Sequence, residues 1–302
     1  MIDLSKMTTE KRNPNSSNLS SLSIREAIEL MNHEDYKVVD CVKEQISNIE
    51  NVIQICTKAL QKKGRIIYIG AGTSGRLGLL DAVECPPTFG VDYNTVVGLI
   101  AGGERAFIKA VEGAEDSKEQ AVEDLKGINF SKEDVLVGIA ASGRTPYVIG
   151  AINYAKEIFA EVCAVVCNKN SEISKICKNI IEVEVGPEIL TGSTRLKAGT
   201  ATKMVLNMIS TISMVNIGKV YKNYMVDVKT SNQKLMLRAK NIVKEVTGCS
   251  EEEANFVLEK SEGSAKIAIV MLLFNCDVNK AKEKLEKVNG RIQDLKGSDH
   301  YD

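Results

Sequence analysis

The stretch "IIYIGAGTSGRLGLLDAVECPPTFG", residues 66–90, begins with a short apolar run and continues into a glycine-rich turn. Gly70, Gly72 and Gly75 have the G-x-G-x-x-G spacing, which in dinucleotide-binding proteins lets the backbone approach a phosphate at a helix N-terminus. The pattern predicts a strand, a tight turn and a helix. The turn could therefore bind a nicotinamide cofactor or another ligand that carries a phosphate.

The next apolar run decides between these two ligands. A dinucleotide site requires an acidic residue at the end of that run, where it binds the ribose hydroxyls. "VVGLI", residues 96–100, is followed by "AGG" and only then by Glu104, at an expected helix start. We therefore predict no nicotinamide cofactor, and expect the glycines to let the backbone approach a single phosphate or sugar hydroxyl.

Five short apolar runs alternate with helical stretches along the chain. Continuous apolar strands separated by helices are typical of a parallel sheet that is covered on both faces. We predict an α/β fold with a doubly wound, five-stranded parallel sheet in a domain of residues 56–225. The runs are "IIYIG" (66–70), "VVGLI" (96–100), "VLVGIA" (135–140), "VCAVV" (162–166) and "IIEVEV" (180–185).

Helical patterns precede and follow the predicted strands in the sequence. Residues 1–55 are predicted to form a helical N-terminal segment, in which Ser23 and a glutamate three residues later have the spacing of a capping box. Residues 226–302 are predicted to form a small all-helical C-terminal domain of three short helices, the first opened by Ser250 in the same pattern.

Length, composition and charge limit the class of function. A chain of 302 residues with 44% hydrophobic composition can bury one large α/β core and a smaller appendage. Its 39 basic and 40 acidic residues are mixed along the chain, which does not favour binding to nucleic acid or an anionic membrane. The polar N-terminus and the lack of any run of transmembrane length predict a cytoplasmic protein.

The eight cysteines are predicted to be reduced, buried thiols. They form no C-x-x-C pair, and only His33 and His300 could help them to bind a metal. We therefore predict no metal site. Cys85 stands beside Glu84, but nothing nearby in the sequence would activate it as a nucleophile.

Three loops after predicted strands have a similar composition. In doubly wound sheets, ligands bind at the carboxyl ends of the strands. Each loop combines glycine with serine or threonine at a helix start, where N–H groups and hydroxyls can surround a phosphate, although such residues also cap ordinary helices. The loops are "GAGTSG" (70–75), "AASGRTPY" (140–147) and "TGSTRLKAGTATK" (191–203).

Several long motifs resemble those of the N-acetylmuramic acid 6-phosphate etherases, a family of the sugar isomerase (SIS) domain superfamily that is related to glucokinase regulatory protein. The resemblance covers nearly the whole chain. It rests on "GAGTSGRLGLLDAVECPPTFG", "GLIAGGERA", "VEGAEDS", "GIAASGRTPYVIGA" and "TGSTRLKAGTATKMVLNMIS". It implies the SIS fold and a cytoplasmic, homodimeric lyase without a cofactor, which releases D-lactate from the phosphosugar during peptidoglycan recycling.

The resemblance also implies a mechanism with two carboxylates. In the open-chain sugar, a base can remove the C2 hydrogen beside the aldehyde, and the lactyl oxygen leaves C3 when it receives a proton. Water then adds to the double bond. The family's two essential carboxylates correspond to Glu84 and Glu115 in this sequence. We assign Glu115 to C2 deprotonation and Glu84 to protonation of the lactate oxygen, and the reverse division of these two roles is the alternative.

The surroundings of Glu84 suggest how its carboxyl could be kept protonated. It follows the apolar "LGLLDAV" and precedes Pro86 and Pro87, which we expect to end the helix. In such an apolar setting, desolvation would favour the protonated acid.

The predicted binding residues are hydroxyl, glycine and basic residues of the three loops. The superfamily's S-x-S-G-x-T phosphate loop appears here as "AASGRT", with Ala140 in place of the first serine. Arg195 and Lys197 could meet the phosphate or the lactyl carboxylate, or could be solvated charges at a helix start. The predicted set is Gly72, Thr73, Ser74, Ser142, Gly143, Thr145, Ser193, Thr194, Arg195 and Lys197.

Two other functions are compatible with this fold. An aldose–ketose phosphosugar isomerase would share the phosphate loops and the abstraction of the C2 proton. A phosphosugar-sensing regulator similar to glucokinase regulatory protein would bind the ligand without chemistry. The regulator has no need of Glu84 and Glu115 together, and the matches around both residues argue against the isomerase.

Overall fold

The computed structural model describes residues 7–109, 111–227 and 233–295. His300 lies outside these ranges. Contacts divide the chain into two compact units. One holds the described residues up to Val83 together with Asn94–Ser210, and the other holds Glu84–Tyr93 together with the described residues from Thr211 onward. The three-part division at residues 55/56 and 225/226 stays a prediction.

The first unit is built on a five-stranded parallel sheet, which confirms the predicted doubly wound α/β fold. The strand order is β2-β1-β3-β4-β5. The strands are β1 (Ile66–Gly70), β2 (Val96–Ile100), β3 (Val135–Ala140), β4 (Glu161–Val166) and β5 (Asn179–Glu182). The chain order reverses between the neighbouring strands β1 and β3, where Gly70 pairs with Ile139. Connections diverge at such a reversal, and in doubly wound sheets ligands bind there, at the carboxyl ends of the strands.

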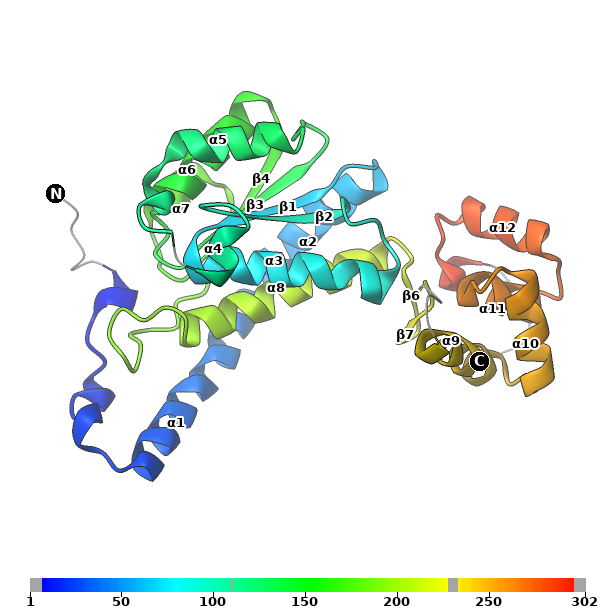
Figure 1. Cartoon of the computed structure of the whole chain (residues 1–302), viewed down its shortest axis with the longest axis horizontal. Coiled ribbons are helices and arrows are strands. Elements are labelled where there is room, and N and C mark those ends of the chain that lie inside the picture. The colour runs from blue at the N-terminus through cyan, green and yellow to red at the C-terminus, as the bar shows by residue number, and fades with distance from the viewer. Residues whose placement is uncertain (1–6, 110, 228–232, 296–302) are drawn as a thin grey trace. The chain divides into compact units, whose positions relative to one another are not determined.

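Helices connect the strands and cover the sheet (Figure 1). The helices in the chain as far as residue 216 are α1 (Ile24–Lys43), α2 (Ile46–Gln61), α3 (Gly72–Phe89), α4 (Arg105–Ile108), α5 (Lys118–Gly127), α6 (Pro146–Glu157), α7 (Glu172–Ile176) and α8 (Lys197–Asn216), of which α1 precedes the first strand and does not cover the sheet (Figure 1). Single 3-10 turns are η1 (Thr8–Glu10), η2 (Pro14–Ser16), η3 (Leu19–Ser21) and η4 (Ala114–Asp116). The predicted capping box of α1 is confirmed, because Ser23 Oγ accepts from the N–H of Glu26.

Both faces of the sheet are apolar, because alternate residues of a strand point to opposite sides. On one face, Ile67 and Leu136 pack with α5 and α6. On the other face, α3 approaches the sheet at Gly78, where a Cβ would lie 3.0 Å from Tyr68 Cβ and 3.1 Å from Ile139 Cδ1. Burial of each large apolar side chain stabilises the fold by about 1.5–3 kcal/mol.

Two of the opening glycines allow α3 to start close to β1. A Cβ at Gly75 would lie 2.6 Å from the carbonyl oxygen of Gly70, which is closer than any real side chain could approach. A Cβ at Gly70 would lie 2.8 Å from the nitrogen of Gly75. These glycines therefore serve the packing of the strand against the helix.

The expectation that Pro86 and Pro87 end the helix is wrong, because α3 continues through both residues as far as Phe89. A proline removes one intrahelical donor and usually breaks a helix interior. Here both prolines lie in the last turns of α3, so only two hydrogen bonds near its end are lost. The helix then closes with a 2.9 Å hydrogen bond from Gly90 N to Pro86 O.

The second unit is mainly helical, as predicted. Its elements are β6 (Val220–Tyr221), β7 (Tyr224–Met225), α9 (Gln233–Thr247), α10 (Glu251–Lys260), α11 (Ala265–Leu273), α12 (Val278–Lys287) and the turn η5 (Ile292–Asp294). The three predicted helices correspond to α10, α11 and α12, and α9 was not predicted. Ser250 and Glu253 form the expected capping box of α10. None of the described helices is long and apolar enough to cross a membrane.

Candidate active site

The first two predicted loops lie next to each other at the reversal of the sheet. β1 ends at Gly70 and β3 ends at Ala140, and these strands pair in parallel. α3 starts at Gly72, and α6 starts at Pro146. The first N–H groups of a helix have no intrahelical acceptor, so both starts can offer donors to an anion.

The first loop has space for a ligand at its second glycine. Gly72 has φ +53°, and beyond its two chain neighbours and the adjoining backbone of α3, no described atom lies within 4 Å of the position that a Cβ would occupy. Thr73 is half-buried and Ser74 is buried at the start of α3. This geometry agrees with a turn that lets a phosphate or hydroxyl approach the backbone.

The second loop has a conformation that requires glycine. Gly143 has φ +68°, and a Cβ there would lie 2.2 Å from Ser171 Oγ. Its nitrogen donates to Ala140 O at 2.9 Å, which closes a tight turn. Ser142 and Thr145 are half-buried, and Thr145 precedes α6 without capping it through its side chain. Both hydroxyls are therefore held at the turn beside β3.

The third loop lies beside the first. A Cβ at Gly199 would lie 3.5 Å from Thr194 O and 3.6 Å from Thr73 Cγ2. Ser193 and Thr194 are half-buried. The structure thus brings the part of the third loop at Gly199, with the Thr194 carbonyl beside it, next to Thr73 at the start of α3.

The expectation that the start of α8 offers N–H groups to a phosphate needs correction. Glu188 is fully buried, and its carboxylate accepts from Lys197 N at 3.0 Å and from Ala198 N at 2.9 Å. Burial raises the pKa of Glu188, although the two N–H groups act in the opposite direction. A protein carboxylate therefore takes the place that an anion would occupy at this helix start.

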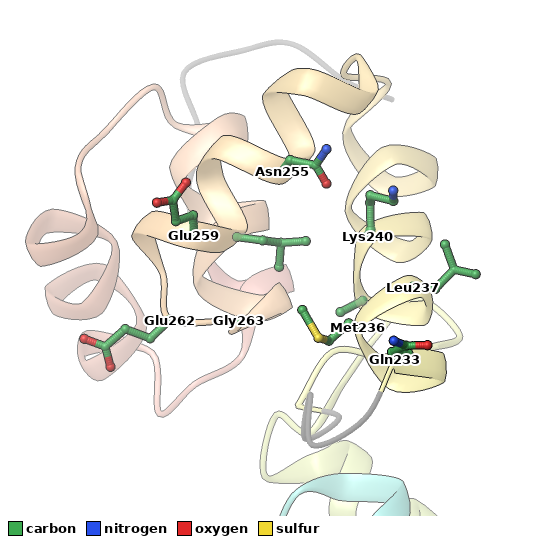
Figure 2. Close-up of a pocket in the computed structure, with 10 residues that line it drawn as sticks. Gln233, Met236, Leu237, Lys240, Asn255, Glu259, Glu262 and Gly263 are labelled. Carbon is green, nitrogen blue, oxygen red and sulfur yellow. The ribbon is translucent and has the colours of Figure 1, made fainter.

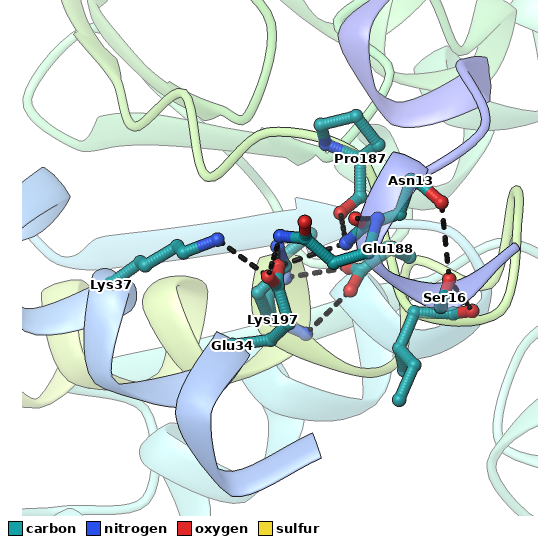
Figure 3. Close-up of polar contacts among 10 residues, drawn as sticks. Asn13, Ser16, Glu34, Lys37, Pro187, Glu188 and Lys197 are labelled. Atoms are coloured by element: carbon teal, nitrogen blue, oxygen red, sulfur yellow. Dashed lines mark hydrogen bonds and ion pairs between the residues drawn. The ribbon is translucent and has the colours of Figure 1, made fainter. Parts of the chain in front are cut away.

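Lys197 and Arg195 are in different environments. The Lys197 side chain is 2% exposed, and its Nζ lies 2.6 Å from Glu34 Oε2 (Figure 3). Arg195 is exposed. The ammonium of Lys197 is thus engaged inside the protein, while the guanidinium of Arg195 is open to solvent.

Glu34 is the centre of a buried polar network that the sequence did not indicate. Its carboxylate accepts from Lys197, from Lys37 and from the side-chain amides of Asn13 and Asn15 (Figure 3). Burial alone would raise the pKa of Glu34. The hydrogen bonds from the two lysines and the two amides outweigh burial, so the pKa lies well below its ordinary value.

The two predicted catalytic carboxylates are both exposed. Glu115 lies in η4, after Gly113 with φ +72°. Glu84 lies on α3, and belongs to the second unit while Glu115 belongs to the first. The expected desolvated setting of Glu84 is not found in the single chain. The helix turns Ala82 and Cys85 inward and leaves Glu84 on its exposed side.

Asp81 is a buried carboxylate that sequence reasoning missed. Asn207 Nδ2 donates to Asp81 Oδ1 at 2.7 Å, and Ser210 Oγ donates to it at 3.1 Å. Burial raises the pKa of Asp81, and these hydrogen bonds oppose the shift. Asp81 therefore links α3 to α8. The signal for a buried carboxylate was present in the sequence, because this acidic residue stands within the apolar segment "LGLLDAV".

The cysteines form no disulfide in the described chain, and five of the eight are buried. Burial raises the pKa of Cys56 and Cys167 to about 12, which keeps both as thiols. Among the described residues, no group of three or more His, Cys, Asp or Glu side chains is arranged to hold a metal ion.

A cavity of about 640 Å³ lies in the second unit, between α9 and the end of α10 (Figure 2). Met236 and Leu258 give it apolar walls, and Asn255 and Glu259 add polar groups. None of the predicted site residues lines it.

Three family models match the chain. The N-terminal SIS domain of glucokinase regulatory protein matches residues 48–156, and the SIS domain matches residues 117–212. The C-terminal lid domain of glucokinase regulatory protein matches residues 222–265.

Curated relatives match almost the full length. An N-acetylmuramic acid 6-phosphate etherase of Francisella tularensis subsp. holarctica (strain LVS) is 59% identical over 290 residues, covering 96% of this chain and 99% of the relative. One of Bacillus mycoides (strain KBAB4) is 57% identical, with the same coverage.

Solved structures share the fold of the sheet region. A putative phosphosugar isomerase from Bacteroides fragilis superposes with a TM-score of 0.52 at 14% identity, covering 69% of this chain and 98% of that one. A phosphoheptose isomerase from Neisseria gonorrhoeae gives 0.50 at 16% identity, covering 63% and 98%. At such low identity, these similarities concern the fold alone.

Proposed function

Since the chain belongs to the N-acetylmuramic acid 6-phosphate etherase family, we propose that it cleaves the D-lactyl ether of N-acetylmuramic acid 6-phosphate. The products are N-acetylglucosamine 6-phosphate and D-lactate, and the reaction serves the recycling of cell-wall sugar. The observation that carries this conclusion is the identity of 56–59% over 96% of the chain to relatives of that name.

The chemistry requires an acid and a base on the sugar. Removal of the C2 hydrogen gives an enolate-type intermediate from which the C3 oxygen departs as lactate, once that oxygen is protonated. We assign the base to Glu115 and the acid to Glu84, which would next activate the water that adds at C3. Both side chains are exposed, so substrate could reach either carboxylate.

The phosphate is assigned to the three loops at the carboxyl ends of the strands. The support is the open space at Gly72, the hydroxyls of Ser142 and Thr145 at the turn beside β3, and the contact between the first and third loops at Gly199. Hydrogen bonds to a charged phosphate contribute about 1.5–3 kcal/mol each. Of the two predicted basic residues, Arg195 is the one available to an anionic group, because Lys197 is paired with Glu34.

A homodimer is part of the proposal. α1 leaves apolar side chains uncovered on one side, including Ile24 (82% exposed), Ile28 (62%) and Val39 (56%). These residues recur at helical spacing, and a second copy of the chain would remove them from water. The cytoplasmic location stays an expectation from the resemblance. Sedimentation of the purified chain tests the dimer.

A phosphosugar-sensing regulator is the second candidate, because family models of glucokinase regulatory protein match residues 48–156 and 222–265. A regulator would bind the phosphosugar without releasing lactate, and an isomerase would exchange the C2 hydrogen without releasing lactate. Measurement of D-lactate from N-acetylmuramic acid 6-phosphate separates the etherase from the other two, and exchange of the C2 hydrogen separates the isomerase from the regulator. Release of lactate supports the etherase, and unchanged substrate after prolonged incubation would refute it.

A further inference from the structure

The N-terminal segment Met7–Ser16 lies against the loops that follow the strands. Met7, Thr9 and Asn13 are buried, although the segment is polar and contains only short turns. We infer that this segment, the N-terminal strap, positions the second and third loops for the phosphosugar, with Asn13 as a positioning residue. The inference rests on the proposed function, since it concerns the loops assigned to that ligand.

The strap is joined to the second loop through Asn168, a buried residue that follows β4. Asn168 Oδ1 accepts from Thr8 N at 2.8 Å. Its Nδ2 donates to Thr9 Oγ1 at 3.0 Å and to Ala141 O at 2.9 Å. One side-chain amide therefore connects the strap to the backbone directly before Ser142.

The strap also holds the segment that leads into the third loop. Asn13 Nδ2 donates to Pro187 O at 3.1 Å, and Ser16 Oγ donates to Ile189 O at 2.7 Å. Both carbonyls lie on the segment that leads into residues 191–196, the part of the third loop that precedes α8 and carries Ser193 and Thr194. These hydrogen bonds fix the direction in which the chain enters the loop.

Asn13 is the point at which the strap meets the buried ion pair. The same Nδ2 group donates to Glu34 Oε2 at 2.9 Å, and this oxygen also accepts from Lys197 Nζ. Lys197 is the first residue of α8 and directly follows residues 191–196 of the third loop. Asn13 therefore connects the segment before the third loop, through Pro187, with Lys197 at the start of α8, through Glu34 (Figure 3).

We expect these contacts to favour ligand binding, because they restrict the conformational freedom of the loops before the ligand arrives. Fixing the backbone of one residue costs about 1–2 kcal/mol, and a loop that is ordered before binding does not lose that freedom when the ligand arrives. Removal of the Asn13 side chain leaves Glu34 paired with both lysines. The main effect is therefore expected in the loop rather than in the sheet.

The test compares Asn13→Ala with Ser23→Ala. Ser23 caps the same helix that carries Glu34, and its side chain hydrogen-bonds to Glu26 of that helix, so its loss lowers stability by about 1 kcal/mol without loosening the loops. Asn13→Ala is expected to raise KM for N-acetylmuramic acid 6-phosphate about 10-fold, or about 1.4 kcal/mol, with kcat changed less than about twofold. Ser23→Ala should leave KM unchanged.

Hydrogen exchange measured without substrate gives a second readout. Amides of residues 188–196 should exchange faster in Asn13→Ala than in the wild type and in Ser23→Ala. Ser16→Ala should act in the same direction, and Ser16→Thr, which retains the hydroxyl, should restore wild-type exchange and KM. These serine variants test the inference even if Asn13→Ala does not fold.

An unchanged KM and unchanged loop exchange in folded Asn13→Ala or Ser16→Ala would overturn the inference, as would an equal rise of KM in Ser23→Ala. Lack of lactate release by the wild type would instead refute the proposed function. The exchange comparison needs no substrate, so the two failures are distinguishable.

Discussion

Replacement of Lys197 by methionine separates its observed structural role from a role in binding substrate. Both partners of the Lys197–Glu34 ion pair are 2% exposed, so solvent cannot replace the lost ammonium. Breaking a buried ion pair by removal of one partner costs about 3–5 kcal/mol, because the remaining charge is left uncompensated. Lys37 stays beside Glu34 but is 44% exposed, and we therefore expect a loss near the lower end, about 3 kcal/mol.

The dependence of this loss on pH follows from Glu34. In the wild type its pKa is lowered, so the carboxylate contributes stability above the ordinary pKa and loses it as pH falls through the lowered value. Without Lys197, burial favours the protonated acid and raises the pKa of Glu34 relative to the wild type. The difference in unfolding free energy between wild type and variant should therefore shrink as pH falls through the pKa that Glu34 has in the variant, before the wild type loses its own contribution at the lower pKa.

The measurement is urea unfolding of wild type, Lys197→Met, Glu34→Gln and the double variant, together with lactate release. The double variant leaves no uncompensated charge, so it should be more stable than the sum of the single losses predicts, by at least about 1.5 kcal/mol. Additive losses, or a Lys197→Met protein as stable as the wild type, would refute the buried-pair reasoning. A large rise in KM without loss of stability would instead indicate that Lys197 meets the substrate.

Three further predictions concern the reaction. Glu84→Gln should lower turnover by about 10²–10⁴-fold with little change in substrate binding, and near wild-type lactate release would remove Glu84 from the mechanism. Ser142→Ala with Thr145→Ala should raise KM through lost hydrogen bonds of about 1.5–3 kcal/mol each, whereas added NAD should alter neither KM nor thermal stability. In heavy, ¹⁸O-labelled water the glucosamine product should carry deuterium at C2 and the label at C3, with unlabelled lactate; label in lactate would indicate displacement at the lactyl carbon. Glu84→Gln should still exchange the C2 hydrogen and Glu115→Gln should not, and the opposite result would exchange their roles.

Local patterns in the sequence were sufficient for the sheet and for two helix starts. A buried parallel strand is a run of neighbouring apolar residues, and a capping box needs only two residues three positions apart. The five strands and the boxes at Ser23 and Ser250 were therefore predictable. The long motifs around Glu84 and Glu115 likewise identified the family, because each motif is continuous in the chain.

The burial and the partners of the charged side chains Lys197, Glu34 and Glu188 were determined only by the tertiary structure. Lys197 reads as an ordinary basic residue at a helix start, and Glu34 as one of several acidic residues on α1. They meet across 163 positions of sequence, together with Asn13, in a place from which water is excluded. Glu188 likewise accepts hydrogen bonds from the N–H groups at the start of α8, where a bound anion could otherwise accept them. Burial and pairing depend on which distant segments fold together, and no local pattern records that, because the free energy of a charge is set by its surroundings rather than by its neighbours in the chain.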